Sequence, residues 1–257
     1  MVRVTLLTDF GTADGYAAAM AGVVAAQAPA ALVEHASHEI PPGDVFGAAL
    51  ALFRYADRYP EGTVHVVVVD PGVGTERRAL AARVDGRYFV APDNGVLTLV
   101  LQAASRVALV EVEDPGILAD SSATFHGRDI FAPAAARLAR GEPLETLGRP
   151  LRDPALLSVA QPERTPDGVR GAVMAVDRFG NLITNIPAHW LAGETRVTVD
   201  GESVGPLLRT YGDVESGEVV ALVGSLDLLE VSVRDGSAAE RLGAGPGTPV
   251  VATGSGA

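Results

Sequence analysis

The chain has no cysteine, which excludes disulfide bonds, thiolate zinc ligands and a cysteine nucleophile. It also has no run of the ~18 consecutive apolar residues that a membrane helix needs. Its first ten residues, MVRVTLLTDF, turn polar too early for a secretory signal. We therefore expect a cytoplasmic protein that has no membrane partner.

Basic residues are few: 20 Lys and Arg stand against 32 Asp and Glu, giving a net charge of −12. A chain of this charge repels a polyanion, so we expect no nucleic-acid partner. Aromatic residues make up only 5% of the sequence, but 47% of it is hydrophobic and its 257 residues suffice for a substantial core. The composition therefore predicts a folded globular protein.

Strand and helix patterns alternate through the first part of the chain. A β-branched strand at 2–7 precedes an Ala-rich helix that ends before Pro29, and strands near 31–36 and 63–69 enclose a helix near 43–59. This alternation is typical of the α/β class, with a mostly parallel sheet flanked by helices. One motif interrupts it, because the Asp-Gly pair in ALAARVDGRYFVA predicts a β-hairpin.

Composition divides the chain into three regions. We expect an α/β N-terminal domain at 1–150, a Pro-rich linker at 151–169 and a C-terminal domain at 170–257. The last region has short apolar strands separated by Gly, Asp and Asn turns, a pattern that predicts a smaller β-barrel-like domain.

Two aspartates directly follow predicted strands. Asp9 comes after VRVTLLT and Asp70 after VHVVVV. Ligands of α/β sheets bind beyond the carboxyl ends of the strands, so both carboxylates are candidates for one site. Asp9 is equally well interpreted as a cap of the next helix. At Asp70 the following Pro-Gly-Val-Gly sequence extends the chain and permits close backbone approach, which slightly favours a functional acid over one that only orders its loop.

A cation and a histidine complete this set of candidates. Arg77 lies seven residues after Asp70 and can return to pair with it, but spacing alone does not separate it from Arg78, and a surface salt bridge explains either arginine. His126 precedes a predicted helix, whose N-terminus disfavours an imidazolium, although a lone histidine there is more often a simple cap. The remaining histidines show no metal-ligand spacing, so we expect no metal.

The C-terminal part offers weaker signals. In DRFGNLITNIP, Asp177 and Asn181 enclose a tight turn with Phe179 at its tip, and turn formation by itself explains these residues. Tyr211 and Ser225 lie on predicted loops, and neither stands out from the residues alone.

Seven motifs, taken together, resemble one family. They are LLTDFGTADGY, SHEIPPGDV, VVVVDPGVGTERR, APDNGVLT, FHGRDIFAPAAARLA, DRFGNLITNIP and GSLDLLEVSV, and they run in this order through nearly the whole chain. The resemblance is to the S-adenosylmethionine (SAM) hydroxide adenosyltransferases, which hydrolyse SAM to adenosine and are related to the bacterial fluorinase and chlorinase. It implies an α/β domain, a β-barrel-like domain and a homotrimer that binds SAM at subunit interfaces.

The resemblance also implies a role for each candidate. Asp70, Arg77 and His126 match the catalytic residues that handle water, which selects Arg77 over Arg78. Asp9 matches the acid that holds the ribose hydroxyls. The other substrate-binding positions that it implies are Asp14 and Asp177 at the methionine end, Phe179 and Asn181 beside Asp177, and Tyr211, Ser225, Glu230 and Val233 at the adenosine end.

Small differences within the family favour hydrolysis. The halogenating relatives lack the acid and the histidine that match Asp70 and His126, and fluorinase has a hydroxyl residue where this chain has Gly127. SAM is then the substrate, and no cofactor is implied. Alternatives are a SAM-dependent 5′-halogenase, a non-catalytic SAM- or adenosine-binding protein and an unrelated nucleotide-binding protein. Two departures lie near the adenine end: Asp227 in place of the family's usual Gly, and VRDGS in place of the commoner Asn-containing version.

Overall fold

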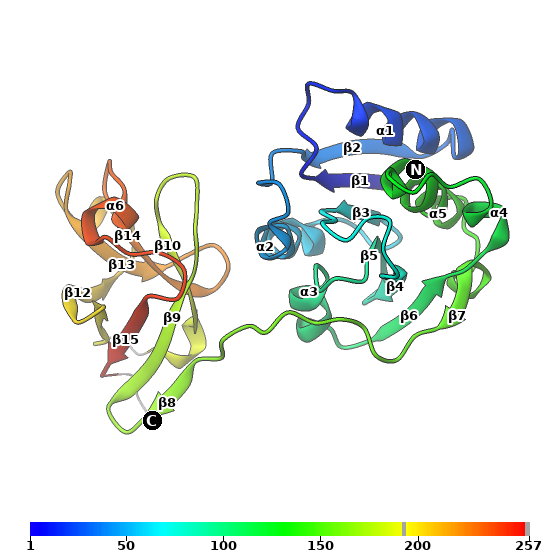
Figure 1. Cartoon of the computed structure of the whole chain (residues 1–257). Helices are drawn as coiled ribbons and strands as arrows, with labels where there is room; N and C mark the ends of the chain where they lie inside the picture. The colour runs from blue at the N-terminus through cyan, green and yellow to red at the C-terminus, as the bar shows by residue number, and fades with distance from the viewer. Residues whose placement is uncertain (192–193, 255–257) are drawn as a thin grey trace. The chain divides into compact units, whose positions relative to one another are not determined.

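The computed structural model describes residues 1–191 and 194–254, and the chain forms two compact units, Met1–Leu157 and Ser158–Ala257 (Figure 1). The first unit contains a seven-stranded sheet and the second a β-barrel. The predicted fold class, an α/β part followed by a smaller β-barrel-like part, is confirmed. In the described ranges, no helix combines the length and apolar character that a membrane crossing requires.

The sheet of the first unit has the order β2-β1-β3-β5-β4-β6-β7. Its first four strands are parallel, whereas β4, β6 and β7 pair antiparallel with their neighbours. The strand bounds are β1 (Arg3–Thr8), β2 (Leu32–Ser37), β3 (Val64–Val68), β4 (Ala79–Val84), β5 (Arg87–Pro92), β6 (Val107–Val112) and β7 (Gly148–Pro150). The sheet therefore has a parallel half and an antiparallel half, and the antiparallel part extends beyond the expected hairpin.

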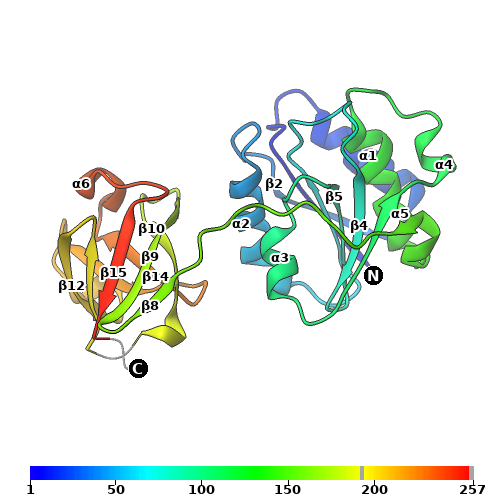
Figure 2. The ribbon, with the colours of Figure 1, turned by 60° about the horizontal axis from the view of Figure 1, so that its bottom comes forward.

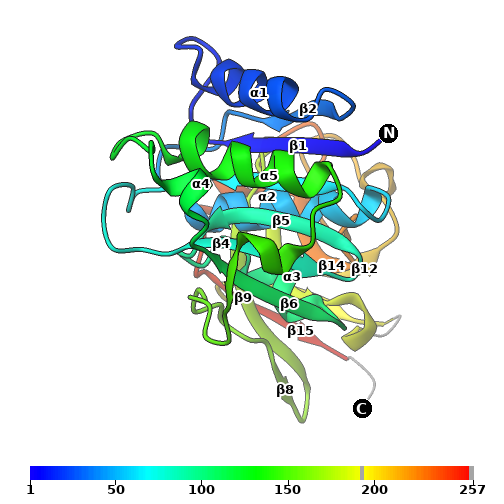
Figure 3. The same cartoon turned by 90° about the vertical axis from the view of Figure 1, so that its right-hand side faces the viewer.

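Helices cover both faces of this sheet, which is why its strand β3 is buried along its whole length. Val64, Val66 and Val68 belong to the core beneath α1 (Tyr16–Gln27) and α5 (Ala132–Ala139). Val67 and Val69 belong to the core beneath α2 (Val45–Tyr55) and α3 (Thr98–Ala103). Figure 2 shows the two helix pairs on opposite sides of the sheet, and Figure 3 looks onto the face that α5 covers.

The hairpin β4-β5 has the predicted two-residue Asp-Gly turn. Asp85 and Gly86 both have positive φ, 44° and 86°, the combination that a type I′ turn requires. The Asp85 carboxylate also accepts hydrogen bonds from the backbone N–H groups of Ser105 and Arg106, so the same acid fixes the start of the next strand. The hairpin prediction is confirmed.

The second unit is a closed barrel. Its strands follow the order β10-β14-β13-β12-β11-β15-β9, the pairing of β9 with β10 closes the ring, and β8 extends it from β9. The bounds are β8 (Glu163–Thr165), β9 (Gly168–Val176), β10 (Leu182–Pro187), β11 (Arg196–Val199), β12 (Glu202–Leu208), β13 (Val219–Val223), β14 (Leu228–Val233) and β15 (Pro249–Thr253). Inward-facing Val, Leu, Ile and Ala side chains fill its core.

Short helical turns complete both units. They are η1 (Ala56–Arg58), α4 (Pro115–Leu118), the π-helical turn η2 (Gly127–Phe131), η3 (Leu144–Leu147), η4 (Ala188–Trp190), η5 (Tyr211–Asp213) and α6 (Ala238–Leu242). In the segment 151–169, the backbone N–H of Ala155 donates to Asp93 and that of Leu157 to Thr98, both in the first unit. Strand β8 lies later in the same segment.

A buried histidine makes the stability of the first unit depend on pH. His65 on β3 is fully buried and pairs through Nδ1 with the Thr5 hydroxyl at 2.8 Å. Burial and the nearby Arg87 charge lower the pKa of His65 to about 3. The unfolded chain, in which the pKa of a histidine is about 6.5, therefore binds the additional proton between these two pH values.

We predict that the free energy of unfolding falls by about 1–2 kcal/mol between pH 7 and pH 5 because of His65 alone. In urea titrations at both pH values, His65→Gln should lose correspondingly less stability on acidification than the wild type. The exposed His189 provides the control, since His189→Gln should keep the wild-type dependence. Equal losses in His65→Gln and the wild type would contradict this assignment.

Candidate active site

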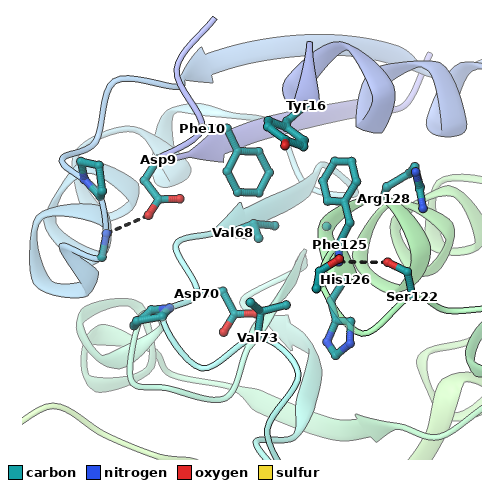
Figure 4. A pocket seen from close by; sticks show the side chains of 15 residues that line it. Asp9, Phe10, Tyr16, Val68, Asp70, Val73, Ser122, Phe125, His126 and Arg128 are labelled. Carbon is teal, nitrogen blue, oxygen red and sulfur yellow. Dashed lines mark hydrogen bonds between the residues drawn. The ribbon is translucent and has the colours of Figure 1, made fainter. Parts of the chain in front are cut away.

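Asp9 and Asp70 lie at the same edge of the sheet. Strands β1 and β3 are parallel neighbours with Thr8 opposite Val68, so the chain leaves both strands side by side. Both aspartates line a cavity of about 900 Å³ in the first unit, together with His126 (Figure 4). This volume is in the range of small-molecule sites.

Arg77 joins Asp70 to His126. Its Nε donates to both carboxylate oxygens of Asp70, at 3.0 and 3.1 Å, and its Nη2 donates to Oδ2 as well. The same Nη2 lies 2.7 Å from Nδ1 of His126. The Asp70 side chain is only 5% exposed and that of Arg77 11%, and the guanidinium lies over the Phe131 ring. The three polar groups therefore form one largely buried, connected set.

Arg78 faces different partners. Its Nε donates to Asp93 at 2.7 Å, and its Nη1 donates to Asp153 at 3.1 Å. Of the two arginines that spacing alone left open, Arg77 is therefore the one that contacts Asp70. Arg78 instead anchors the chain that follows β7 to the loop after β5.

The glycine loop after Asp70 packs closely on the segment that leads to His126. Gly74 has a φ of +77°, and a Cβ at this position would lie 2.6 Å from the backbone oxygen of Ala123. Only glycine fits both this conformation and this approach. The loop can therefore bring Asp70 and Arg77 to His126, although 49 residues separate the arginine from the histidine.

His126 precedes the π-helical turn η2, which runs directly into α5. Burial lowers the pKa of His126, and the adjacent Arg77 charge lowers it further against the opposing effects of Asp70 and Asp129. The imidazole is therefore neutral at neutral pH. An arginine can only donate, so Nδ1 is the acceptor in this pair and the imidazole proton resides on Nε2.

Asp9 is not the cap of α1. The residue at that position is Gly15, and no side chain caps the helix. The Asp9 carboxylate instead accepts a hydrogen bond from the Gly43 N–H through Oδ2, at 2.8 Å. Asp14 is exposed in the loop before α1 and is not among the residues that line the cavity.

Several residues of this site were not among the candidates that the sequence analysis singled out. Phe10, Tyr16 and Phe125 form a cluster of edge-to-face rings on the cavity wall, with centroids 5.1 to 6.0 Å apart. Asn94 donates to the backbone oxygen of Val69 at 2.8 Å and so holds the end of β3 just before the catalytic candidate. Aromatic residues at these spacings have no characteristic pattern, so only the tertiary structure identifies them.

In the second unit, Asp177 organises the predicted turn. Its Oδ1 accepts from the backbone N–H groups of Phe179 and Asn181, and its Oδ2 accepts from the Asn181 amide. Phe179 is 75% exposed at the tip. Turn formation therefore explains the hydrogen bonds of Asp177. The same turn also places the Asp177 carboxylate close to the exposed Phe179 ring.

Tyr211 and Glu230 form a second polar pair in this unit. The Tyr211 hydroxyl donates to Glu230 Oε1 at 2.7 Å, and the Ser232 hydroxyl donates to the same oxygen at 2.9 Å. Burial, Glu230 and the charge of Asp177 raise the pKa of Tyr211 to about 12. Glu230 and Asp177 therefore both raise the pKa of the partly exposed Tyr211.

The remaining candidates lie around strand β14. Ser225 is exposed in the loop before it, and Val233 is its buried last residue. Asp227 has a φ of 56°, a conformation that glycine adopts freely and aspartate tolerates. The departure from the family's usual glycine therefore preserves the turn.

The described part of the chain contains no group of three or more His, Asp or Glu side chains arranged to hold a metal ion. The site chemistry that it does contain is an acid and a neutral histidine that line one cavity and are joined by an arginine. Such a set can position a water molecule and accept its proton.

Comparisons with known proteins show the family of the chain. A family model described as the SAM hydroxide adenosyltransferase N-terminal domain matches residues 4–148, and the corresponding C-terminal domain model matches residues 171–251. The chain belongs to the SAM hydroxide adenosyltransferase family.

Individual relatives cover nearly the whole chain. The sequence is 46% identical to the (R)-S-adenosyl-L-methionine hydrolase of Thermus thermophilus, over 97% of this chain and 99% of that protein. It is 29% identical to a fluorinase of an Actinoplanes species, over 89% and 90%. A solved structure of an uncharacterized conserved protein from Thermotoga maritima has a TM-score of 0.89 and 34% identity, over 98% of this chain and 100% of that one.

We predict that Arg77→Gln raises the pKa of His126. The substitution removes the positive charge that lowers this pKa and leaves the Asp70 charge that raises it. An NMR titration of the histidine ring signals measures the change. The neighbouring Arg78→Gln serves as the control and should leave the His126 titration unchanged. An unchanged His126 pKa in Arg77→Gln would show that the guanidinium and the imidazole do not interact in solution.

Proposed function

We propose that this protein hydrolyses S-adenosyl-L-methionine at ribose C5′, giving adenosine and L-methionine. The observation that carries the proposal is the connected set of Asp70, Arg77 and His126, of which Asp70 and His126 line the cavity that Asp9 also lines. Support also comes from the (R)-S-adenosyl-L-methionine hydrolase of Thermus thermophilus, which is 46% identical. Following that relative, we propose that the preferred substrate has the (R) configuration at sulfur.

The chemistry needs little beyond positioning. The sulfonium makes methionine a good leaving group, so the enzyme has to hold a water oxygen in line behind C5′. The C5′–O bond forms while the C5′–S bond breaks, the electron pair of that bond stays on the methionine sulfur, and one water proton is lost. Two hydrogen-bonding groups and a base suffice for this step.

Asp70 is the base in this mechanism. Arg77 occupies part of its hydrogen-bonding capacity, but a carboxylate has about four acceptor positions and retains room for the water proton. His126 has the complementary role: with its proton on Nε2, it donates to the water oxygen and orients it. Arg77 holds Asp70 in place and stabilises the charge that develops on the oxygen.

The cavity wall suits the rest of the substrate. Asp9 has one carboxylate oxygen bound to Gly43, and we assign the other to the ribose hydroxyls. The rings of Phe10, Tyr16 and Phe125 provide faces and edges for the cationic sulfonium, because aromatic faces attract cations. We assign Asp14 to the methionine end.

The second unit supplies the complementary groups. We assign the acid Asp177 to the methionine ammonium, with Asn181 and Phe179 beside it, and Tyr211 to packing against adenine. Ser225, Glu230 and the backbone near Val233 complete the adenosine contacts. These assignments rest on the family resemblance, together with the acidic surroundings of Tyr211.

We also propose a cytoplasmic homotrimer in which the second unit of one subunit completes the site of its neighbour. This assembly rests on the family resemblance. Sedimentation equilibrium tests the assembly.

A 5′-halogenase is less well supported. A Cβ at Gly127 would lie 3.1 to 3.3 Å from Met20, Phe125 and Phe10, which leaves little room for the hydroxyl residue that fluorinase has at this position.

The test is incubation with each sulfur epimer of SAM, with and without chloride, followed by chromatography of the products. We expect adenosine and methionine from the (R) epimer in both conditions. Asp70→Asn should lower kcat at least about 100-fold and change the SAM dissociation constant by less than about threefold. The exposed control Asp57→Asn should retain activity. A chloride-dependent halogenated nucleoside, or binding without turnover, would contradict hydrolysis.

A further inference from the structure

A buried histidine near Asp9 has no role in the mechanism above. His38 directly follows β2 and is only 6% exposed. Both nitrogens of its ring are bonded: Nδ1 lies 2.8 Å from the Thr8 hydroxyl, and Nε2 lies 2.7 Å from Nδ1 of His35. Thr8 is fully buried at the end of β1, whereas His35 is exposed on the edge strand β2. The three side chains therefore form a hydrogen-bonded chain from the surface to the residue just before Asp9.

This chain of hydrogen bonds is satisfied by a neutral ring. Burial lowers the pKa of His38, and the neighbouring His35 lowers it further against the opposing effect of Glu39. A neutral imidazole has one donor nitrogen and one acceptor nitrogen, so it donates to one neighbour and accepts from the other. The Thr8 hydroxyl and the His35 ring can each take either role. His38 is therefore held at both nitrogens without a buried charge.

His38 fixes the backbone that follows Asp9 in two ways. The Thr8 hydroxyl oxygen, which pairs with the His38 ring, also accepts the backbone N–H of Phe10 at 3.2 Å. The backbone oxygen of His38 accepts the N–H of Gly11 at 2.8 Å. Gly11 has a φ of 63°, so the chain turns directly after these bonds. The turn that presents Asp9 is therefore built on the His38 ring and on the His38 carbonyl.

The segment that begins at His38 also holds the Asp9 side chain. Later in this segment, the Gly43 N–H donates to Asp9 Oδ2 at 2.8 Å. Asp9, Phe10 and Gly43 all line the cavity (Figure 4). Residues 38–43 thus fix the backbone of the Asp9 turn at one end and the Asp9 carboxylate at the other. A movement of this backbone would displace the carboxylate oxygen that Gly43 does not bind.

We propose that His38 is a positioning residue, which acts through Thr8 and the Phe10 backbone to hold the Asp9 carboxylate in place for the ribose hydroxyls. The inference rests on the proposed SAM hydrolysis, in which Asp9 binds the ribose. Hydrogen bonds weaken steeply with a poor angle, so a displaced carboxylate loses its bonds to the sugar. The ribose does not react, and its bonds stabilise the bound substrate and the transition state alike. The loss should therefore raise KM and leave kcat nearly unchanged.

The test measures kcat and KM for SAM, and the melting temperature, in six enzymes. These are the wild type, His38→Ala and His38→Asn, each with Asp9 intact and with Asp9→Asn. An asparagine amide can occupy about the place of the imidazole Nδ1, so His38→Asn keeps a partner for Thr8 and loses the contact with His35. Rescue by this variant separates the contact with Thr8 from the bulk of the ring.

His65→Asn is the matched control. His65 is also buried and also pairs through Nδ1 with a threonine of β1, at 2.8 Å. That threonine, Thr5, lies within β1, whereas Thr8 is the last residue of the strand, before Asp9. His65→Asn should lower the melting temperature, as His38→Ala does, but keep the wild-type KM.

In His38→Ala we expect KM for SAM to rise about 10-fold and kcat to change by less than about threefold. His38→Asn should return KM to within about threefold of the wild type. In the Asp9→Asn background the carboxylate is already lost, so His38→Ala should raise KM by less than about twofold more. If His38→Ala does not fold, Thr8→Val removes the same hydroxyl contact and should give the same pattern.

Three results would overturn the proposal: an unchanged KM in His38→Ala, an equal rise of KM in His65→Asn, or the full 10-fold rise in the Asp9→Asn background. If the wild type does not hydrolyse SAM, the proposed function fails by itself. The dissociation constants of the same enzymes for SAM and for adenosine, measured by calorimetry, then decide the role of His38 with the same expected pattern. A wild type that binds neither ligand would overturn this inference as well.

Discussion

The guanidinium of Arg77 holds the candidate active site together, because it binds Asp70 and His126 at the same time. Removing one partner of a buried ion pair typically lowers the free energy of unfolding by about 3–5 kcal/mol, because the other charge is left buried without a partner. Asp70 and Arg77 therefore depend on each other. The arginine also determines the chemistry of its neighbours: it orients the acid, lowers the pKa of the imidazole and places the imidazole proton on Nε2. One side chain thus makes one neighbour a base and the other a donor.

Much of the surrounding structure serves this contact. Two parallel strands end side by side and place Asp9 and Asp70 at one sheet edge. Gly74 lets the following loop approach the backbone at Ala123, and Asn94 fixes the end of β3. The π-helical turn then directs His126 into the same cavity. The barrel contributes a different kind of surface, in which acids surround an exposed tyrosine ring.

The sequence predicts the fold because its patterns are local. Alternating strands and helices, the Asp-Gly hairpin and the short strands of the barrel all depend on neighbours in the chain. The choice between Arg77 and Arg78 depends instead on which acid each one meets in space, so spacing left it open until the family resemblance selected Arg77. Contacts between distant segments form the ring cluster of Phe10, Tyr16 and Phe125 and also place Arg128 beside it. No periodic pattern in the sequence predicts these contacts.

The central claim is that the cavity activates water to attack ribose C5′. The most direct test is turnover of SAM in ¹⁸O-labelled water, with mass spectrometry of both products. The account predicts one ¹⁸O atom in adenosine, at the 5′ position, and none in methionine. Unlabelled adenosine, or label in methionine, would contradict attack of water at C5′.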